Sequence, residues 1–171
     1  LRKKKNIFIE GSCAENRKKD IFTNSCHIIS ILLKIFEDFK ILNIKNNKNY
    51  IFIQSRTKYN NLMLIKFNFK AAENFEIKII DNNLVYLFKP IEKLSIYRDL
   101  RQVLVNKINY YLPNKIKEIN EFKIDIYKPG FLNQVKLFKK FIKYDKPILN
   151  NIKFAEKVSK ICNQIYGKKF F

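Results

Sequence analysis

The spacing of the apolar residues changes twice along this chain, and that change constrains the fold more than any other feature. Between residues 25 and 37 apolar side chains recur every three or four positions, which is typical of a helix with one buried face. From residue 40 to 88 they form short β-branched and aromatic runs separated by Asn- and Asp-rich turns, which indicates consecutive antiparallel strands. Helical spacing returns in 131–144 and 150–166. The pattern predicts an α+β domain whose three helices pack on one face of a sheet.

The expected strands cover residues 40–44, 50–56, 62–70, 75–79 and 84–88. The segment that follows is less regular. There we expect a short strand or turn at 91–97, a helix over 98–111 that ends before Pro113, and an edge strand at 121–126. Gly130 breaks the chain before the second helix, and Gly167 stands where a glycine commonly follows a helix end.

The charge balance is strongly basic, with 35 Lys and Arg against 15 Asp and Glu and a formal net charge of +20. A basic chain rich in aromatics can bind nucleic acid, with cations on phosphates and rings under bases. Here the lysines are dispersed and outnumber arginine, and the composition favours residues with AT-rich codons, so codon bias is the better explanation. A basic RNA- or ribosome-associated protein stays the alternative, with Phe67, Phe69, Tyr86 and Phe88 as its binding face.

The cysteines Cys13, Cys26 and Cys162 are odd in number and lack C-x-x-C spacing. This argues against a zinc site and against a disulfide framework, so we expect no metal and a reducing, cytoplasmic location. No apolar run is long enough to span a membrane. The start of the chain, a basic run before Asn6–Glu10, is too short and polar for a secretory signal, and we expect an upstream part to be missing.

The only histidine, His27, lies where a turn becomes the first apolar helix. Thr23, Asn24 and Ser25 are residue types that cap a helix start by accepting its first N–H groups. We therefore expect His27 in the first turn of a core helix, where an imidazole can accept or donate a proton near pH 7. A histidine that only packs and hydrogen-bonds is the alternative, and a nucleophilic role for the adjacent Cys26 is disfavoured because neighbouring residues point in different directions.

This segment resembles the pattern Asp-x-Gly-x-His-x-x-Asp followed by an apolar helix, found in the glucose–fructose oxidoreductase and inositol dehydrogenase (Gfo/Idh/MocA) family of NAD(P)-dependent oxidoreductases. His27 matches the histidine, whereas Thr23, Ser25 and Ser30 stand where Asp, Gly and Asp are expected. The end of the chain is also similar to the family's ending, with its Phe-x-x-Gln-x-x-x-Phe helix and its Ala-rich helix before Gly-Lys. The matching residues there are Phe131, Gln134, Phe138, Ala155, Gly167 and Lys168.

The resemblance implies that residues 1–171 are a single C-terminal α+β domain, an open and mostly antiparallel sheet with helices on one face. It implies a sugar or sugar-nucleotide substrate, with His27 as a catalytic residue and with Thr23 and Asn24 in contact with the substrate. It also implies a homo-oligomer formed through the sheet, no membrane and no nucleic acid.

The cofactor implied is NAD or NADP. The chain has three glycines and no glycine-rich turn after a strand, so it holds no dinucleotide-binding unit of its own. We expect that unit upstream of Leu1, with cofactor-binding residues in this chain unknown and the isolated chain inactive. The Asp expected at Thr23 and at Ser30 is missing, which weakens the expected proton relay.

Overall fold

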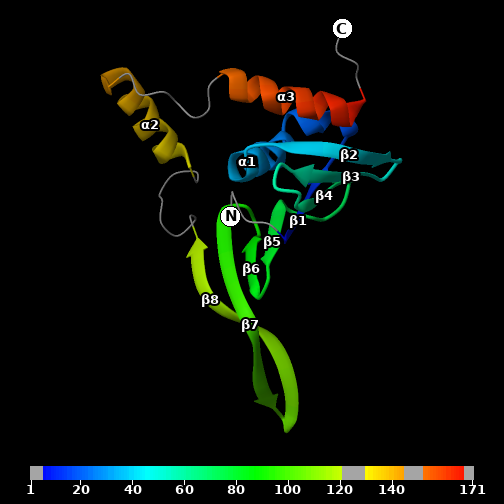
Figure 1. The fold of residues 1–171 in the computed structure, drawn as a ribbon, viewed down its shortest axis with the longest axis vertical. Coiled ribbons are helices and arrows are strands. Elements are labelled where there is room, and N and C mark those ends of the chain that lie inside the picture. The colour runs from blue at the N-terminus through cyan, green and yellow to red at the C-terminus, as the bar shows by residue number, and fades with distance from the viewer. Residues whose placement is uncertain (1–5, 121–129, 145–151, 168–171) are drawn as a thin grey trace.

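A computed structural model describes residues 6–120, 130–144 and 152–167. Its eight strands form one sheet in the order β2-β3-β4-β1-β5-β6-β7-β8 (Figure 1). Neighbouring strands are antiparallel except β1 and β4, which are parallel. The strands are β1 (Ile7–Glu15), β2 (Phe39–Asn46), β3 (Tyr50–Thr57), β4 (Leu62–Phe69), β5 (Glu76–Asp81), β6 (Leu84–Phe88), β7 (Lys93–Val105) and β8 (Ile108–Asn120). The helices are η1 (Lys18–Phe22, 3-10), α1 (Cys26–Phe36), α2 (Phe131–Tyr144) and α3 (Ile152–Tyr166).

This architecture confirms the predicted fold class, an open and mostly antiparallel α+β sheet with helices on one side. The predicted order of the strands is wrong at one point. The strands from 40 to 88 were expected to be consecutive neighbours, but β1 lies between β4 and β5. The alternation of buried and half-buried residues along β1 shows that one of its faces lies in the core and the other is only partly covered, and its position between β4 and β5 makes it a central strand.

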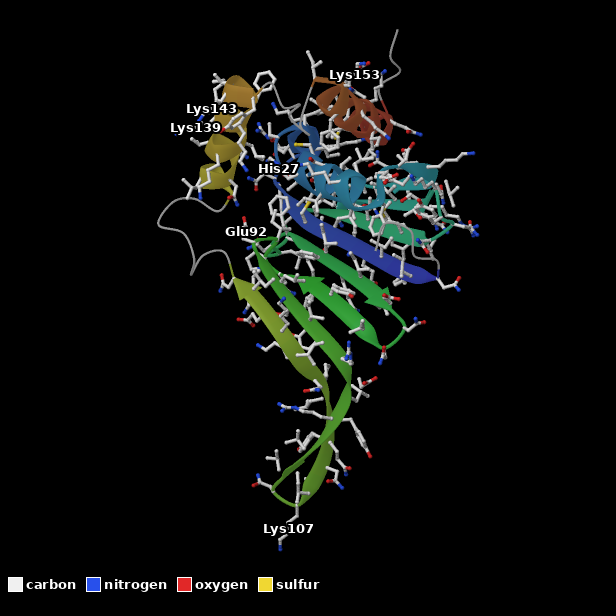
Figure 2. All side chains as sticks on the ribbon, turned by 60° about the vertical axis from the view of Figure 1, so that its left-hand side comes forward. His27, Glu92, Lys107, Lys139, Lys143 and Lys153 are labelled. Atoms are coloured by element: carbon white, nitrogen blue, oxygen red, sulfur yellow. The ribbon has the colours of Figure 1, made fainter. Side chains whose placement is uncertain are left out.

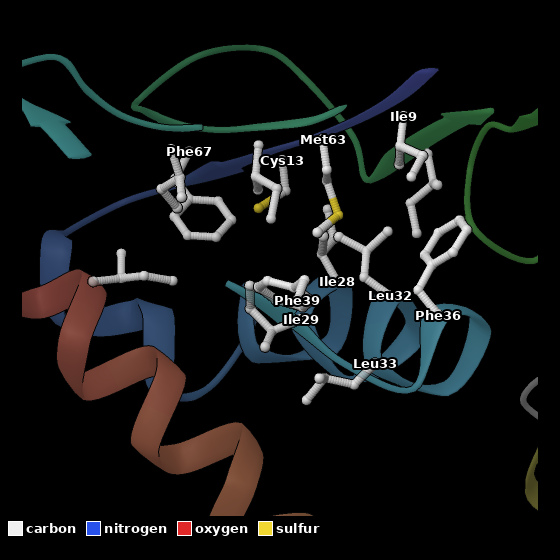
Figure 3. Close-up of a cluster of buried hydrophobic side chains, with 14 of the residues drawn as sticks. Ile9, Cys13, Ile28, Ile29, Leu32, Leu33, Phe36, Phe39, Met63 and Phe67 are labelled. Carbon is white, nitrogen blue, oxygen red and sulfur yellow. The ribbon is translucent and has the colours of Figure 1, made fainter. Parts of the chain in front are cut away.

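The hydrophobic core lies between the sheet and α1 (Figure 3). Ile9 of β1, Ile53 of β3 and Ile65 of β4 point into it, and α1 contributes Ile28, Ile29, Leu32, Leu33 and Phe36. Gly11 lets α1 approach β1 closely, since a Cβ at that position would lie 3.4 Å from Cγ2 of Ile28. The helix is therefore held against the centre of the sheet.

Helix α3 forms a second helical layer, packed on α1 and η1 rather than on the sheet. Cys162 and Ile165 are buried, and Phe154, Val158 and Ile161 pack against the same core. At the other end, Lys157 Nζ lies 3.1 Å from the Asp38 carboxylate and donates to the Glu37 carbonyl oxygen at 3.0 Å. The two helices are thus joined by apolar packing along their length and by a cation at the C-terminal end of α1.

Helix α2 occupies the residues predicted for it, but the prediction that it packs on the sheet is wrong. Its apolar side chains are exposed, and Figure 1 shows the helix standing apart from α1 and α3. They are Val135, Leu137, Phe138, Phe141 and Ile142. The predicted edge strand at 121–126 lies outside the described residues.

Residues 98–111 were predicted as a helix and instead belong to the hairpin of β7 and β8. Leu100, Val103 and Leu104 imitate helical spacing, but the segment also contains two Val, one Ile and two Tyr, which favour extended backbone. The turn is made by Asn106 and Lys107 with φ of 50° and 64°, the left-handed pair that a two-residue hairpin requires. Pro113 is tolerated because β8 is an edge strand.

The distal part of this hairpin, residues 99–114, is called the arm below. It projects from the sheet and ends at Lys107 (Figures 1 and 2). Among the helices of the described residues, none has the length and apolar character needed to cross a membrane.

Candidate functional site

The chemistry-bearing residues of the helical layer gather at a hollow between α1 and α3. Its volume is about 320 Å³. It is lined by Phe22, Cys26, His27, Ser30, Phe154, Ala155, Val158, Ser159 and Cys162. Apolar walls with a few polar groups at one rim are the usual composition of a small-molecule site.

His27 lies in the first turn of α1, as predicted, and its side chain is exposed at this hollow (Figure 2). Ser30 follows three residues later on the same helix face, and Ser159 approaches from α3. An imidazole and two hydroxyls can together hydrogen-bond the hydroxyl groups of a polyol, and the imidazole can take or return a proton. Because α1 lies on the covered side of the sheet, His27 lies on that side and not on the open face.

Thr23 and Asn24 do not line the hollow. The Thr23 hydroxyl donates to the Asp20 carbonyl oxygen at 3.0 Å, and the Asn24 side-chain amide donates to the Glu15 carboxylate at 3.1 Å. The structure therefore directs both side chains into the turn that precedes α1. The expectation that they cap the helix is wrong, and neither side chain lies at the hollow that holds His27.

Glu15 fixes the turn that precedes His27. Its side chain is only 3% exposed, at the end of β1. Its carboxylate accepts the Ser25 N–H at 2.7 Å, the Ser25 hydroxyl and the Asn24 amide. Cys13 Sγ lies 3.0 Å from the Ser25 Oγ on the other side. A buried carboxylate that receives several hydrogen bonds is well satisfied, and here it ties the start of α1 to the central strand.

Ser25 was predicted to cap α1 with its hydroxyl, but its hydroxyl binds Glu15 instead. It is the residue before α1, but its side chain makes no capping bond to the helix. Its hydroxyl points backward to Glu15, and the helix begins with the backbone bond from Ile28 N–H to the Ser25 carbonyl oxygen at 3.0 Å. The start of α1 is set by contact with β1 rather than by a local cap.

The cysteine thiols of this region are poor nucleophiles. Burial raises the pKa of the Cys26 thiol, and burial raises the pKa of both Cys13 and Cys162 to about 12. A thiol that stays protonated at neutral pH does not attack an electrophile. These shifts support the sequence argument against Cys26 as a nucleophile.

The aromatic face proposed for RNA binding does not exist. Phe67 is fully buried, and Phe69, Tyr86 and Phe88 pack against the core. Bases stack on aromatic rings that are exposed on a sheet surface. One of these four residues lies within the core and the other three pack against it, so they do not form an exposed stacking surface.

Sequence reasoning missed several residues of the site. Ser30 was noted only as a replaced Asp, although its spacing of three from His27 already places both on one helix face. The hollow residues of α3, such as Phe154 and Ser159, carry no local signal because they reach His27 only through tertiary packing. Glu15 lies ten residues before Ser25 in a segment whose strand was not recognised, so nothing in the sequence linked the two.

The described residues do not fit a dinucleotide. In the dinucleotide-binding fold the pyrophosphate lies at a glycine-rich turn between a strand and a helix. Gly11 lies within β1, packed against α1, and Gly130 and Gly167 lie at helix ends. Across the described ranges, no three His, Cys, Asp or Glu side chains gather as they would around a metal ion.

No family model matches this sequence, and no curated protein is significantly similar to it. Solved structures do share its fold. UDP-N-acetylglucosamine 3-dehydrogenase from Acidithiobacillus ferrooxidans matches with a TM-score of 0.63 and 10% identity, over 94% of this chain and 53% of that protein. Levoglucosan dehydrogenase in complex with NADH and L-sorbose matches with a TM-score of 0.67 and 9% identity, over 97% of this chain and 57% of that protein. A Gfo/Idh/MocA family oxidoreductase from Vibrio cholerae matches with a TM-score of 0.51 and 13% identity, over 94% of this chain and 52% of that protein.

The chain spans about half the length of these enzymes, and the match uses nearly all of its residues. At such low identity the likeness concerns the fold. The mixed sheet and its helical layer therefore have the fold of the C-terminal domain of Gfo/Idh/MocA family dehydrogenases, as the sequence resemblance predicted.

Proposed function

We propose that this chain is the substrate-binding and oligomerisation domain of an NAD(P)-dependent oxidoreductase that acts on a hydroxyl of a sugar or sugar nucleotide. The observation that carries the proposal is the hollow that holds His27, Ser30 and Ser159 on the fold of a sugar dehydrogenase. Imidazole and hydroxyl groups beside an apolar wall suit a sugar, which presents hydroxyls on its rim and C–H groups on its faces.

In this proposal residues 1–171 are one domain, and the nucleotide-binding domain lies outside the chain. NAD or NADP is held mainly by that other domain, because the described residues offer no turn for a pyrophosphate. The isolated chain is then inactive. The free state of Cys13, Cys26 and Cys162 suits a reducing compartment such as the cytoplasm, where thiols are not oxidised to disulfides.

His27 has the role of a proton carrier. It is exposed, and it is anchored through the Glu15 network at the start of α1, so its imidazole is presented to the hollow on a rigid element. Ser30 and Ser159 orient the substrate hydroxyl toward it. General acid–base help of this kind is worth roughly 10²- to 10⁴-fold in rate.

The test uses the fact that His27 is the only histidine of the protein. Its ring protons give a single set of NMR signals, which can be followed while levoglucosan, UDP-N-acetylglucosamine or UDP alone is added. We expect a saturable shift of these signals with a sugar-bearing ligand. UDP alone shows whether the nucleotide or the sugar is responsible.

A pair of variants on α3 supplies the control. Ala155→Phe places a ring in the hollow and is expected to weaken sugar binding at least about tenfold, whereas Gln164→Phe puts the same ring on exposed α3 surface outside the hollow and leaves binding unchanged. Unshifted His27 signals at millimolar concentrations of each sugar ligand would refute the proposed site.

The cofactor part of the proposal has its own measurement. Calorimetric titration of the chain with NAD⁺, NADH, NADP⁺ and NADPH is expected to give no saturable heat, because the described residues lack a pyrophosphate site. Micromolar binding of any of the four would show that a nucleotide site exists within this chain.

A further inference from the structure

Helix α2 places its cationic side chains on one face. The helix contains four lysines and no acidic residue. These lysines are called the basic face, and they are Lys136, Lys139, Lys140 and Lys143. Side chains three, four or seven residues apart lie on the same side of a helix, so the four ammonium groups point in similar directions. Lys139 and Lys143, one helical turn apart, are labelled in Figure 2.

The large apolar side chains of α2 cover the other side of the helix. They form two adjacent rows, which together are called the apolar face: Val135, Phe138 and Ile142 in one row, and Leu137, Phe141 and Tyr144 in the other. Each of the six side chains is between 38% and 68% exposed. Within the described ranges no helix or strand packs extensively on α2. The apolar face is therefore open to a partner.

The basic face borders the apolar face on both sides. Lys139 neighbours Val135 on the helix surface, and Lys140 neighbours Tyr144, each at a spacing of four residues. The long apolar stem of a lysine can lie along apolar surface while its ammonium group reaches toward water or toward an anion. A contact through the apolar face thus brings these ammonium groups to the rim of the contact.

The composition of α2 distinguishes a lipid surface from a protein partner. Protein interfaces are enriched in arginine, tryptophan and methionine and are depleted in lysine. α2 has four lysines and none of those three enriched residue types. A helix that lies in the plane of a membrane surface instead combines lysines on its polar face with phenylalanine and leucine on the other. The side chains of α2 match this second description.

The charge of the whole chain favours the same partner. Its formal net charge is +20. Anionic lipids give the cytoplasmic leaflet of a membrane a negative surface potential, which attracts basic segments. Electrostatic attraction brings the protein to such a surface, and the apolar face of α2 then supplies the short-range contact.

We propose that α2 attaches the protein to an anionic lipid surface, with the apolar face among the acyl chains and the lysines at the headgroups. Such attachment differs from spanning, for which no helix of the described residues is long and apolar enough. It departs from the expectation of no membrane, which the family resemblance implied. It does not depend on the proposed substrate or cofactor.

Co-sedimentation of the intact chain with lipid vesicles tests the attachment. Vesicles of phosphatidylcholine with about one third phosphatidylglycerol are expected to bind the chain saturably, and pure phosphatidylcholine vesicles at least about tenfold more weakly, because the lysines lose their anionic partner. No binding to the anionic vesicles, or equal binding to both kinds, would overturn the proposal.

Two exposed apolar residues give a matched pair of variants with the same change of charge. Phe138→Glu puts a carboxylate on the apolar face and is expected to weaken binding to the anionic vesicles at least about tenfold. Leu104→Glu puts the same group on the arm and is expected to weaken it less than about twofold. Equal losses would mean that the general positive charge binds the vesicles without α2, which overturns the proposal.

The lysines are tested by a second matched pair. Lys139→Gln with Lys140→Gln removes two charges at the border of the apolar face and is expected to weaken binding at least about tenfold. Lys40→Gln with Lys45→Gln removes two exposed charges from β2 and is expected to have a clearly smaller effect. Equal effects of the two double variants would contradict recognition by the basic face.

The orientation of α2 has a direct readout, because the chain contains no tryptophan. The fluorescence of the Phe141→Trp variant is expected to shift to shorter wavelength when anionic vesicles are added, since the indole enters the acyl region. The Lys136→Trp variant, on the basic face, is expected to keep its emission wavelength. No shift for Phe141→Trp, or a shift at least as large for Lys136→Trp, would overturn the proposal.

Discussion

The helix-covered part of the sheet and the arm are built from the same kinds of residues but have opposite surroundings. Ile53 and Ile65 are fully buried beneath α1, whereas Leu104 and Ile108 on the arm are more than half exposed. Both regions have strand-forming side chains and antiparallel partners. The comparison shows that the local sequence pattern determines where a strand forms. Whether that strand is stable by itself depends on burial under a second layer of structure.

Helices α1 and α2 differ in the same way as the covered sheet and the arm. α1 and α2 both have an apolar stripe, but the stripe of α1 is buried on β1, and α2 exposes Phe138 and Ile142. α1 is held by the close approach at Gly11 and by the Glu15 network. The site residue His27 is thus carried by the better supported of the two helices, as a site that needs a fixed geometry requires.

The largest expected effect is a truncation in the covered region. Phe36→Ala removes a fully buried ring of α1 and is expected to lower the free energy of unfolding by about 3–5 kcal/mol. Leu104→Ala on the arm is expected to cost less than about 1 kcal/mol, because the side chain is 67% exposed. Urea unfolding monitored by circular dichroism measures both. Similar losses for the two variants would remove the distinction between the regions.

The next effect concerns the anchor of the histidine turn. Glu15→Ala leaves the Ser25 N–H without its acceptor and is expected to cost about 1–3 kcal/mol. Combining it with Ser25→Ala is expected to cost clearly less than the sum of the single changes, because both remove the hydrogen bond from the Ser25 hydroxyl to the Glu15 carboxylate. Strict additivity in the urea-unfolding cycle would mean that Glu15 does not hold the turn.

The buried thiols predict a dependence of stability on alkaline pH. Burial raises the pKa of Cys13 and Cys162 from about 9 in the unfolded chain to about 12, so the folded protein keeps protons that the unfolded chain loses. This contribution is complete below pH 9 and disappears as the pH rises toward 12. Cys13→Ala with Cys162→Ala is therefore expected to lose less stability between pH 8 and 10.5 than the unmodified protein. An identical decline in both proteins would contradict burial of these thiols.

The smallest expected effect is on α2. Ile142→Ser is expected to change the free energy of unfolding by less than about 0.5 kcal/mol, since the side chain is 68% exposed. The same measurement on Ile29→Ser in α1, where the side chain is fully buried, is expected to show a severe loss. A large effect of Ile142→Ser would indicate that α2 is packed against something in solution.

Much of the secondary structure could be predicted because its signals are local. Alternation over 75–79 and 84–88 marks strands, and Gly130 with Gly167 bounds the two closing helices. β1 was not recognised because its partner β4 lies more than 50 residues away and its parallel pairing leaves no hairpin turn to read. The arm was misassigned because leucine and valine at helical spacing outweighed its β-branched and aromatic content.

Some features of the candidate site could likewise be predicted from the sequence, and others could not. His27 and its place at the start of α1 could be predicted, since the change of spacing locates the helix start. The directions of Thr23 and Asn24 could not, because Glu15 and the Asp20 carbonyl draw them away from the helix. The contribution of α3 to the hollow depends on how two helices stack, which one sequence does not reveal.

The central claim is that the helical layer stabilises the region carrying His27, whereas the arm has no such layer. Native-state hydrogen exchange tests it most directly, because it reports the protection of each region separately. The account predicts that the amides of β1 and α1 exchange far more slowly than those of residues 99–114. Arm amides as well protected as those of β1, or α1 amides that exchange as fast as those of the arm, would contradict it.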